Sequence, residues 1–148
     1  MSADPSPATR EVHTGSAGET EAAAARLARS LRPGDVLLLE GPLGAGKTTF
    51  VRGLAQGLGV EGRVASPTYQ LVRVYQGRIP LVHADLFRLE NPAELSGLDL
   101  DEPAGRGVLA VEWGDRITWP GAGRVRLEER GPTARTLRLL GAPERWSF

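Results

Sequence analysis

The stretch GPLGAGKTT, residues 41–49, decides the fold of this chain. Four of its positions fill the pattern G-x-x-x-x-G-K-[ST]: Gly41, Gly46, Lys47 and Thr48. Glycines in this pattern let successive backbone N–H groups turn inward around an anion. The apolar run VLLLE, residues 36–40, predicts a buried strand before the loop. After the loop, apolar residues at helical spacing predict a helix: Val51, Leu54, Ala55 and Leu58. A strand, a glycine-rich loop and a helix in this order predict a phosphate-binding loop.

Lys47 is the only lysine in the chain, beside 17 arginines. A lysine supplies a compact charge on a flexible stem, whereas the planar fork of arginine does not suit a tight loop. We therefore expect Lys47 to reach the β- and γ-phosphates and the Thr48 hydroxyl to hold a magnesium ion. The predicted ATP-binding residues of the loop are Gly41, Gly44, Ala45, Gly46, Lys47, Thr48 and Thr49.

The sequence also favours adenine over guanine as the base. Guanine-specific proteins with this loop usually carry an N-K-x-D element. The only asparagine here is Asn91 and the only lysine is Lys47, so that element is absent. ATP and a magnesium ion are accordingly the predicted cofactors.

Two acidic residues follow apolar runs that predict strands. Asp85 ends IPLVHAD and Glu112 ends GVLAVE. Carboxylates at the ends of strands beside a phosphate loop can hold magnesium or act on the attacking water. We predict that both are catalytic and that both belong to the metal site with Thr48. The sequence leaves open which acid takes which role.

Three further residues lie near these motifs. Thr68, in SPTY, occupies the place where nucleotide switches carry a threonine that senses the γ-phosphate. Trp113 follows Glu112 directly and is expected on the other side of the strand, either in packing or in a partner contact. His83 shares a strand face with Asp85 and is interpreted as a core or hydrogen-bonding histidine.

The composition bounds the class of protein. A chain of 148 residues predicts one domain, which we place at 14–141 between a polar N-terminal tail (1–13) and a short C-terminal tail (142–148). The absence of cysteine excludes disulfides and cysteine-ligated metal sites. Zero net charge gives no long-range attraction for nucleic acid. There is neither a signal-peptide pattern nor an apolar run of about 18 residues, so we expect a cytoplasmic protein.

The remaining patterns complete a predicted α/β fold. Residues 20–31 predict a helix capped by Thr20, and Asn91 with Pro92 predicts the start of another. Residues 70–75 and 79–87 predict a hairpin, whereas 124–130 and 135–140 predict an antiparallel pair at a sheet edge. We therefore expect a single P-loop NTPase-like domain. Its central sheet would be mostly parallel, flanked by helices, with antiparallel edge strands.

Taken in order, GPLGAGKTT, SPTY, HADLFRLENPAEL and AVEW resemble one family. It is the bacterial tRNA threonylcarbamoyladenosine biosynthesis ATPase, or TsaE, family, and the resemblance covers residues 14 to 140. The phosphate loop alone is common to very many proteins, so the combination of motifs in a short chain carries the resemblance. Pro42 and Phe87 depart from the residues usual in the family, an acid and a tyrosine, and neither touches the predicted chemistry.

The resemblance implies a weak ATPase that works with a threonylcarbamoyl transferase subunit and its non-catalytic paralogue. Hydrolysis would support turnover of an assembly that modifies adenosine next to the anticodon, with tRNA bound mainly through the partners. Five positions carry over directly: Lys47 and Thr48 for phosphate and magnesium, Glu112 as a magnesium ligand, Asp85 as an essential acid, and Thr68 as the switch threonine. Trp113 carries over as a functional neighbour, and Ser16–Thr20 and Arg135 as residues that approach the adenine.

Two other functions fit the same phosphate loop. A small-molecule kinase would need a lid, for which only residues 90–107 are available, flanked by Arg88 and Arg106. A non-hydrolytic switch would bind ATP and recruit partners, with Asp85, Glu112 and Thr68 reporting the nucleotide state.

Overall fold

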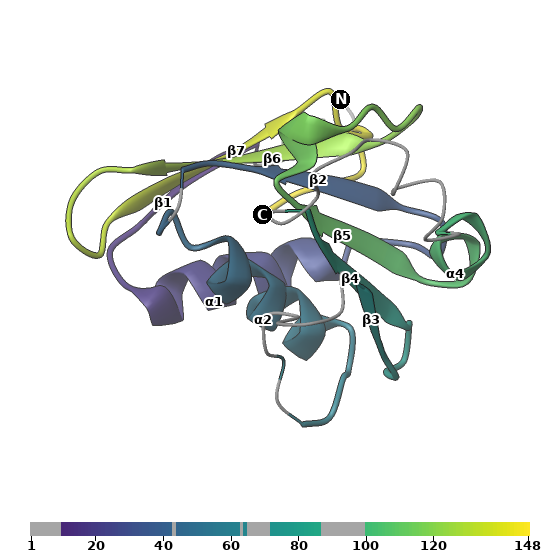
Figure 1. Cartoon of the computed structure of the whole chain (residues 1–148). Coiled ribbons are helices and arrows are strands. Elements are labelled where there is room, and N and C mark those ends of the chain that lie inside the picture. The colour runs from purple at the N-terminus through teal and green to yellow at the C-terminus, as the bar shows by residue number, and fades with distance from the viewer. Residues whose placement is uncertain (1–9, 43, 63, 65–71, 87–99) are drawn as a thin grey trace, which may run out of the picture.

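A computed structural model describes residues 10–42, 44–62, 64, 72–86 and 100–148. Its strands form one seven-stranded sheet in the order β1-β7-β6-β2-β5-β4-β3 (Figure 1). The strands are β1 (Glu11–Thr14), β2 (Val36–Glu40), β3 (Val72–Tyr75), β4 (Leu81–Asp85), β5 (Val108–Glu112), β6 (Gly123–Glu129) and β7 (Arg135–Leu140). Thr68 and the helix start predicted at Asn91 lie outside the described residues.

The centre of the sheet is parallel and its margins are antiparallel. Strand β2 pairs in parallel with both β5 and β6, and β5 pairs in parallel with β4. The pairs β3–β4, β6–β7 and β1–β7 are antiparallel. This arrangement confirms the predicted α/β sheet. It also places the carboxyl ends of β2, β4 and β5 together, which is where open α/β sheets bind their ligands.

Two helices cover one face of the sheet, α1 (Ala17–Ala28) and α2 (Lys47–Gly57) (Figure 1). They cross closely, because a Cβ on Gly53 would lie 2.2 Å from the Glu21 carbonyl oxygen. Leu37 and Leu39 of β2 and Leu54 of α2 lie in the core cluster beneath these helices. The position of α2 therefore depends on a glycine that lets two backbones approach.

The opposite face holds a second core cluster. Val36 and Leu38 of β2 point into it, together with Leu109 and Val111 of β5. Ala104, from the short helix α4 (Asp101–Arg106), contributes to its cover. Because β2 and β5 are buried on both faces, they read as unbroken apolar runs in the sequence.

The first helix begins earlier than its apolar spacing suggests. Ser16, and not Thr20, is its N-cap, and the Ser16 hydroxyl accepts a hydrogen bond from the Glu19 backbone N–H at 3.1 Å. The Glu19 side chain in turn accepts from the backbone N–H of Gly15, the residue before the N-cap. Thr20 instead points inward, where its hydroxyl lies 2.7 Å from that of Thr14.

Both ends of the described chain belong to the fold. Strand β1 pairs with β7, so β1 and not the β6–β7 pair forms that edge of the sheet. The folded part therefore starts before residue 14. At the other end, Trp146 is 1% exposed in the first core cluster, and its indole N–H donates to Asp35. No helix in the described ranges is long and apolar enough to cross a membrane.

Candidate functional site

The glycine-rich loop joins β2 to α2, as its sequence predicts. Gly41, Gly44 and Gly46 all have positive φ, at 152°, 85° and 98°. A Cβ on Gly41 would lie 2.7 Å from the Leu127 carbonyl oxygen, so glycine is required there both sterically and conformationally. Gly46 is the N-cap of α2 and supplies no side-chain acceptor. The first N–H groups of the helix are therefore not capped by a side chain. They lie at the loop, together with the positive end of the helix dipole.

Lys47 is held inside this loop and is only 5% exposed. Its ammonium donates to the carbonyl oxygens of Gly41 and Pro42, at 2.5 and 3.1 Å. Burial lowers the pKa of Lys47 below its ordinary 10.5, and the carboxylates of Glu112, Asp115 and Asp85 oppose that shift. The lysine is therefore a buried cation bound by the backbone of its own loop.

The Trp113 ring also contacts this ammonium. The centre of its ring lies 3.6 Å from the Lys47 Nζ, a cation–π contact. Its backbone is left-handed, with φ 61° and ψ 40°, the only described non-glycine residue with positive φ. Gly114 follows, and a Cβ there would lie 2.6 Å from that of Leu38. Trp113 packs against the second core cluster, on the predicted side of the strand, and its turn also directs the ring over Lys47.

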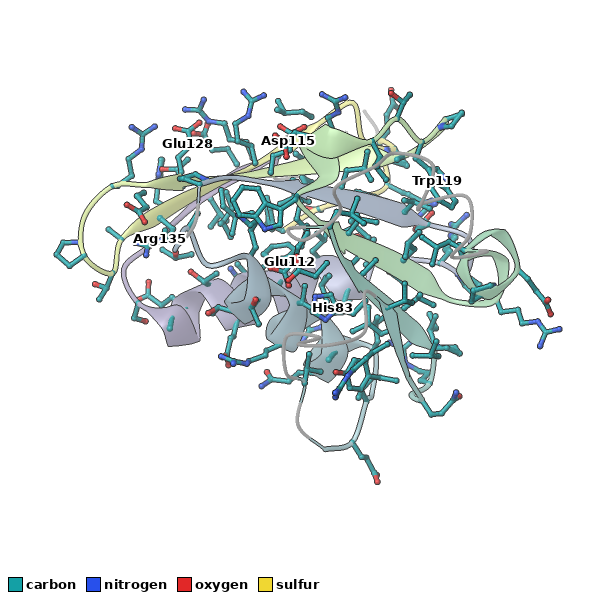
Figure 2. The ribbon with its side chains drawn as sticks, in the orientation of Figure 1. His83, Glu112, Asp115, Trp119, Glu128 and Arg135 are labelled. Atoms are coloured by element: carbon teal, nitrogen blue, oxygen red, sulfur yellow. The ribbon has the colours of Figure 1, made fainter. Side chains whose placement is uncertain are left out.

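Glu112 is bound by two side chains and is 3% exposed. The Thr48 hydroxyl donates to its two carboxylate oxygens at 3.0 and 3.1 Å. The imidazole Nε2 of His83 lies 2.6 Å from Glu112 Oε2. Figure 2 shows His83 and Glu112 directed toward each other between the sheet and the helices.

Asp85 lies level with Glu112 in the parallel pairing of β4 and β5. Both residues end their strands and share a face of the sheet. The effect of the Asp85 carboxylate on the Lys47 pKa places it within electrostatic reach of the loop. The structure thus brings together four of the predicted residues: Lys47, Thr48, Asp85 and Glu112.

Arg135, from β7, contacts the loop from its outer side. Its Nε donates to the Ala45 carbonyl and its Nη2 to the Gly44 carbonyl, each at 3.0 Å. A third donor, Nη1, reaches the Gly131 carbonyl at 3.0 Å. The guanidinium therefore fixes the Gly44 and Ala45 carbonyls of the loop toward β7.

Among the described residues, two cavities line the loop. A cavity of about 110 Å³ lies at the start of α2, beside Arg135, and is lined by Ala17, Thr20, Gly46, Thr49, Pro132, Thr133 and Arg135. A larger cavity, of about 590 Å³, lies between the loop and β6; Pro42, Trp113, Asp115 and Glu128 are among its lining residues. Figure 2 shows Asp115 and Glu128 on the side of the sheet away from α1 and α2.

Two contacts of the candidate site could not be predicted from the sequence. The link from His83 to Glu112 joins residues 29 positions apart, and its only sequence signal is that His83 lies two residues before Asp85. The contact between Trp113 and Lys47 depends on a left-handed turn that Gly114 alone hints at.

Comparison with known proteins identifies the family of this chain. The family model of the threonylcarbamoyl adenosine biosynthesis protein TsaE matches residues 14–136. The tRNA threonylcarbamoyladenosine biosynthesis protein TsaE of Streptomyces coelicolor is 44% identical over 133 residues, which cover 82% of this chain and 90% of that protein. The protein of the same name from Bacillus subtilis is 49% identical over 100 residues, 67% of this chain and 63% of that protein.

A solved structure supports the fold. The crystal structure of Bacillus subtilis YdiB superposes with a TM-score of 0.75 and 33% sequence identity, over 92% of this chain and 87% of that one. The family match covers most of the chain, including the glycine-rich loop, both strand-end acids and Arg135. The chain therefore belongs to the TsaE family of tRNA threonylcarbamoyladenosine biosynthesis proteins.

Proposed function

We propose that this protein binds ATP with magnesium at the glycine-rich loop and hydrolyses it. One observation carries the proposal: the Thr48 hydroxyl lies 3.0 Å from the Glu112 carboxylate, beside the buried Lys47 ammonium. Such a group of a hydroxyl, a carboxylate and an ammonium is what a magnesium-bound triphosphate requires. The uncapped first N–H groups of α2 would add donors for the phosphate oxygens.

The donor set fits magnesium. Magnesium prefers oxygen ligands and is usually held by one or two carboxylates together with phosphates and waters. Thr48 and Glu112 supply a hydroxyl and a carboxylate at one point, and Asp85 ends the neighbouring strand. When bound, the ion would neutralise charge that develops on the β- and γ-phosphates.

Each residue then has a task that follows from its surroundings. Lys47 would exchange the Gly41 and Pro42 carbonyls for phosphate oxygens, because its stem is flexible. Thr48 and Glu112 would hold the metal. Asp85, which ends the neighbouring strand within electrostatic reach of Lys47, would orient the attacking water and accept its proton. Arg135 keeps the loop in shape, and the cavity beside it offers room toward the base.

The family membership supplies the biological setting. Relatives named for tRNA threonylcarbamoyladenosine biosynthesis suggest that hydrolysis here serves the same modification. We propose that the protein acts in the cytoplasm with a threonylcarbamoyl transferase subunit and its non-catalytic paralogue. Nucleotide turnover would reset that assembly, while the partners carry most of the tRNA contact, in keeping with the zero net charge of this chain.

Steady-state release of inorganic phosphate tests the proposal. We expect slow release from wild-type protein with magnesium and ATP, a changed rate with the two partner subunits, and a loss of at least 100-fold in Lys47→Ala or Glu112→Gln. Hydrolysis by Lys47→Ala equal to that of the wild type, with partners present, would contradict it. Transfer of label from ATP to a metabolite would indicate a kinase, and bound ATP that persists for hours with partners would indicate a non-hydrolytic switch.

A further inference from the structure

We propose that His83 is a positioning residue that holds the Glu112 carboxylate in place when the Thr48 hydroxyl turns from that carboxylate to the metal ion. The inference rests on the proposed magnesium–ATP function and assigns a role to a residue outside the phosphate loop and the two strand-end acids. It starts from a contact between two buried side chains. His83 is fully buried and Glu112 is 3% exposed, with 2.6 Å between Nε2 and Oε2.

The surroundings of the imidazole fix which nitrogen donates. Within the described part of the chain, Nδ1 of His83 is buried without a hydrogen-bond partner. A proton on Nδ1 would leave a buried N–H unsatisfied and would turn a bare Nε2 lone pair toward a carboxylate oxygen. A proton on Nε2 avoids both costs and donates to Glu112 Oε2. The geometry therefore favours the Nε2–H tautomer.

The His83 donor matters most when the Thr48 hydroxyl no longer bonds to Glu112. In the structure, Glu112 is held by two donors, the Thr48 hydroxyl and the His83 ring. A Thr48 hydroxyl that ligates the metal no longer restrains the carboxylate. His83 would then keep Oε2 in position and leave Oε1 available to a metal ion, as outer-shell partners of metal ligands do.

The pairing of β4 with β5 places His83 within reach of Glu112. In the parallel pairing of β4 and β5, His83 lies level with Ala110, two residues before Glu112 on the same strand face. The small side chain of Ala110 leaves the imidazole room to extend toward the carboxylate. Because β4 and β5 each pair with a strand on both sides, the ring and the acid keep a fixed separation.

A pair of amide variants separates this role from packing. In His83→Gln, the side-chain amide nitrogen can occupy the place of Nε2 and donate to Glu112. In His83→Asn, the amide reaches only as far as Nδ1. Val82→Ala serves as the control, because Val82 is equally buried on the same strand but points to the opposite face.

The measurement is the affinity of the protein–ATP complex for Mn²⁺, taken from the loss of the free-ion signal in electron paramagnetic resonance. Affinity for ATP in EDTA is measured in parallel. We expect His83→Asn to weaken Mn²⁺ binding by about 10-fold or more, with ATP affinity in EDTA within about twofold of wild type. His83→Gln should recover most of the loss, and Val82→Ala should lower the melting temperature without changing Mn²⁺ affinity.

Several outcomes would overturn the inference. Wild-type Mn²⁺ affinity in His83→Asn would do so, as would an equal loss in Val82→Ala, which would assign the effect to packing. If wild-type protein shows no metal-dependent ATP binding, both the proposed function and the inference are wrong. If ATP binding depends on the metal but is the same in wild type and His83→Asn, only the inference is wrong. If His83→Asn does not fold, ¹⁵N spectroscopy of the wild-type imidazole decides, because an unprotonated Nε2 contradicts the proposal and a protonated one supports it.

Discussion

Lys47 shows how much of the site is determined by a single side chain. Two backbone carbonyls and an indole ring surround its ammonium, and the carboxylates of Glu112, Asp115 and Asp85 lie within electrostatic reach. The loop therefore holds a cation that its own peptide oxygens stabilise before any phosphate arrives. Phosphate binding at this loop, as proposed above, would need no further burial of the charge and would replace these carbonyls with phosphate oxygens.

The environment of Lys47 predicts how stability depends on pH in protein without nucleotide or metal. Because burial lowers the pKa of Lys47 below 10.5, the unfolded chain binds more protons than the folded protein between the lowered pKa and 10.5. The free energy of unfolding should therefore rise with pH across that window, relative to Lys47→Met. Urea unfolding of both proteins in EDTA at a series of alkaline pH values tests this. If the difference in the free energy of unfolding between the two proteins stayed constant or fell with pH, the prediction would be wrong.

The same crowding predicts that arginine cannot replace this lysine. The guanidinium is larger and planar, and the Trp113 ring lies only 3.6 Å from the position of Nζ. We expect Lys47→Arg to fold but to bind magnesium–ATP at least about 10-fold more weakly, as measured by calorimetry. Affinity equal to that of the wild type would show that charge alone suffices.

At the scale of elements, the position of α2 depends on its crossing with α1. Gly53 and Gly57 face α1, and a Cβ on Gly57 would lie 2.5 Å from the Cβ of Ala28. The same helix begins at the glycine-rich loop after β2 and carries Lys47 and Thr48. The close crossing of α1 and α2 therefore helps to position the candidate site.

This crossing predicts a strong effect of one methyl group. Gly53→Ala would place its Cβ 2.2 Å from the Glu21 carbonyl oxygen, so we expect a loss of about 1–3 kcal/mol in the free energy of unfolding. Gly105→Ala in α4 is the matched control, because nothing lies within 4 Å of its added Cβ. That variant should be neutral or slightly stabilising. Chemical denaturation measures both, and equal effects would refute the packing argument.

At the scale of the whole molecule, the C-terminal residues close the core. The Trp146 indole packs in the first cluster, and Asp35 accepts hydrogen bonds from both Trp146 and Arg145. Gly123 at the start of β6 leaves room for the ring, since a Cβ there would lie 2.3 Å from it. Segments at opposite ends of the chain thus meet, with Arg10 donating to the Ala142, Pro143 and Trp146 carbonyls.

The C-terminal contact predicts a global effect of a residue far from the loop. Removal of the fully buried ring in Trp146→Ala should lower the free energy of unfolding by about 3–5 kcal/mol. We expect Trp146→Phe to recover part of that loss. Denaturant unfolding compares the three proteins. A loss below about 1 kcal/mol in Trp146→Ala would mean that residues 142–148 do not support the core.

The sequence predicts those parts of the molecule that depend on local patterns. The strand–loop–helix unit follows from residues 36–58, and the two acids follow from apolar runs that end in a carboxylate. Contacts between distant residues are not visible in this way: the pairing of β1 with β7, the burial of Trp146 and the bond from His83 to Glu112. Each of these depends on tertiary packing, for which the local sequence around the residue carries no signal.

We propose that the glycine-rich loop, the start of α2 and the single lysine bind the triphosphate of magnesium–ATP. Calorimetric titration of magnesium–ATP into the folded wild-type protein tests this binding, with Lys47→Ala as the matched variant. We expect a saturable heat for the wild type that weakens in EDTA and disappears in Lys47→Ala. A folded wild-type protein that gives no binding heat, or a Lys47→Ala variant that binds equally well, would contradict it.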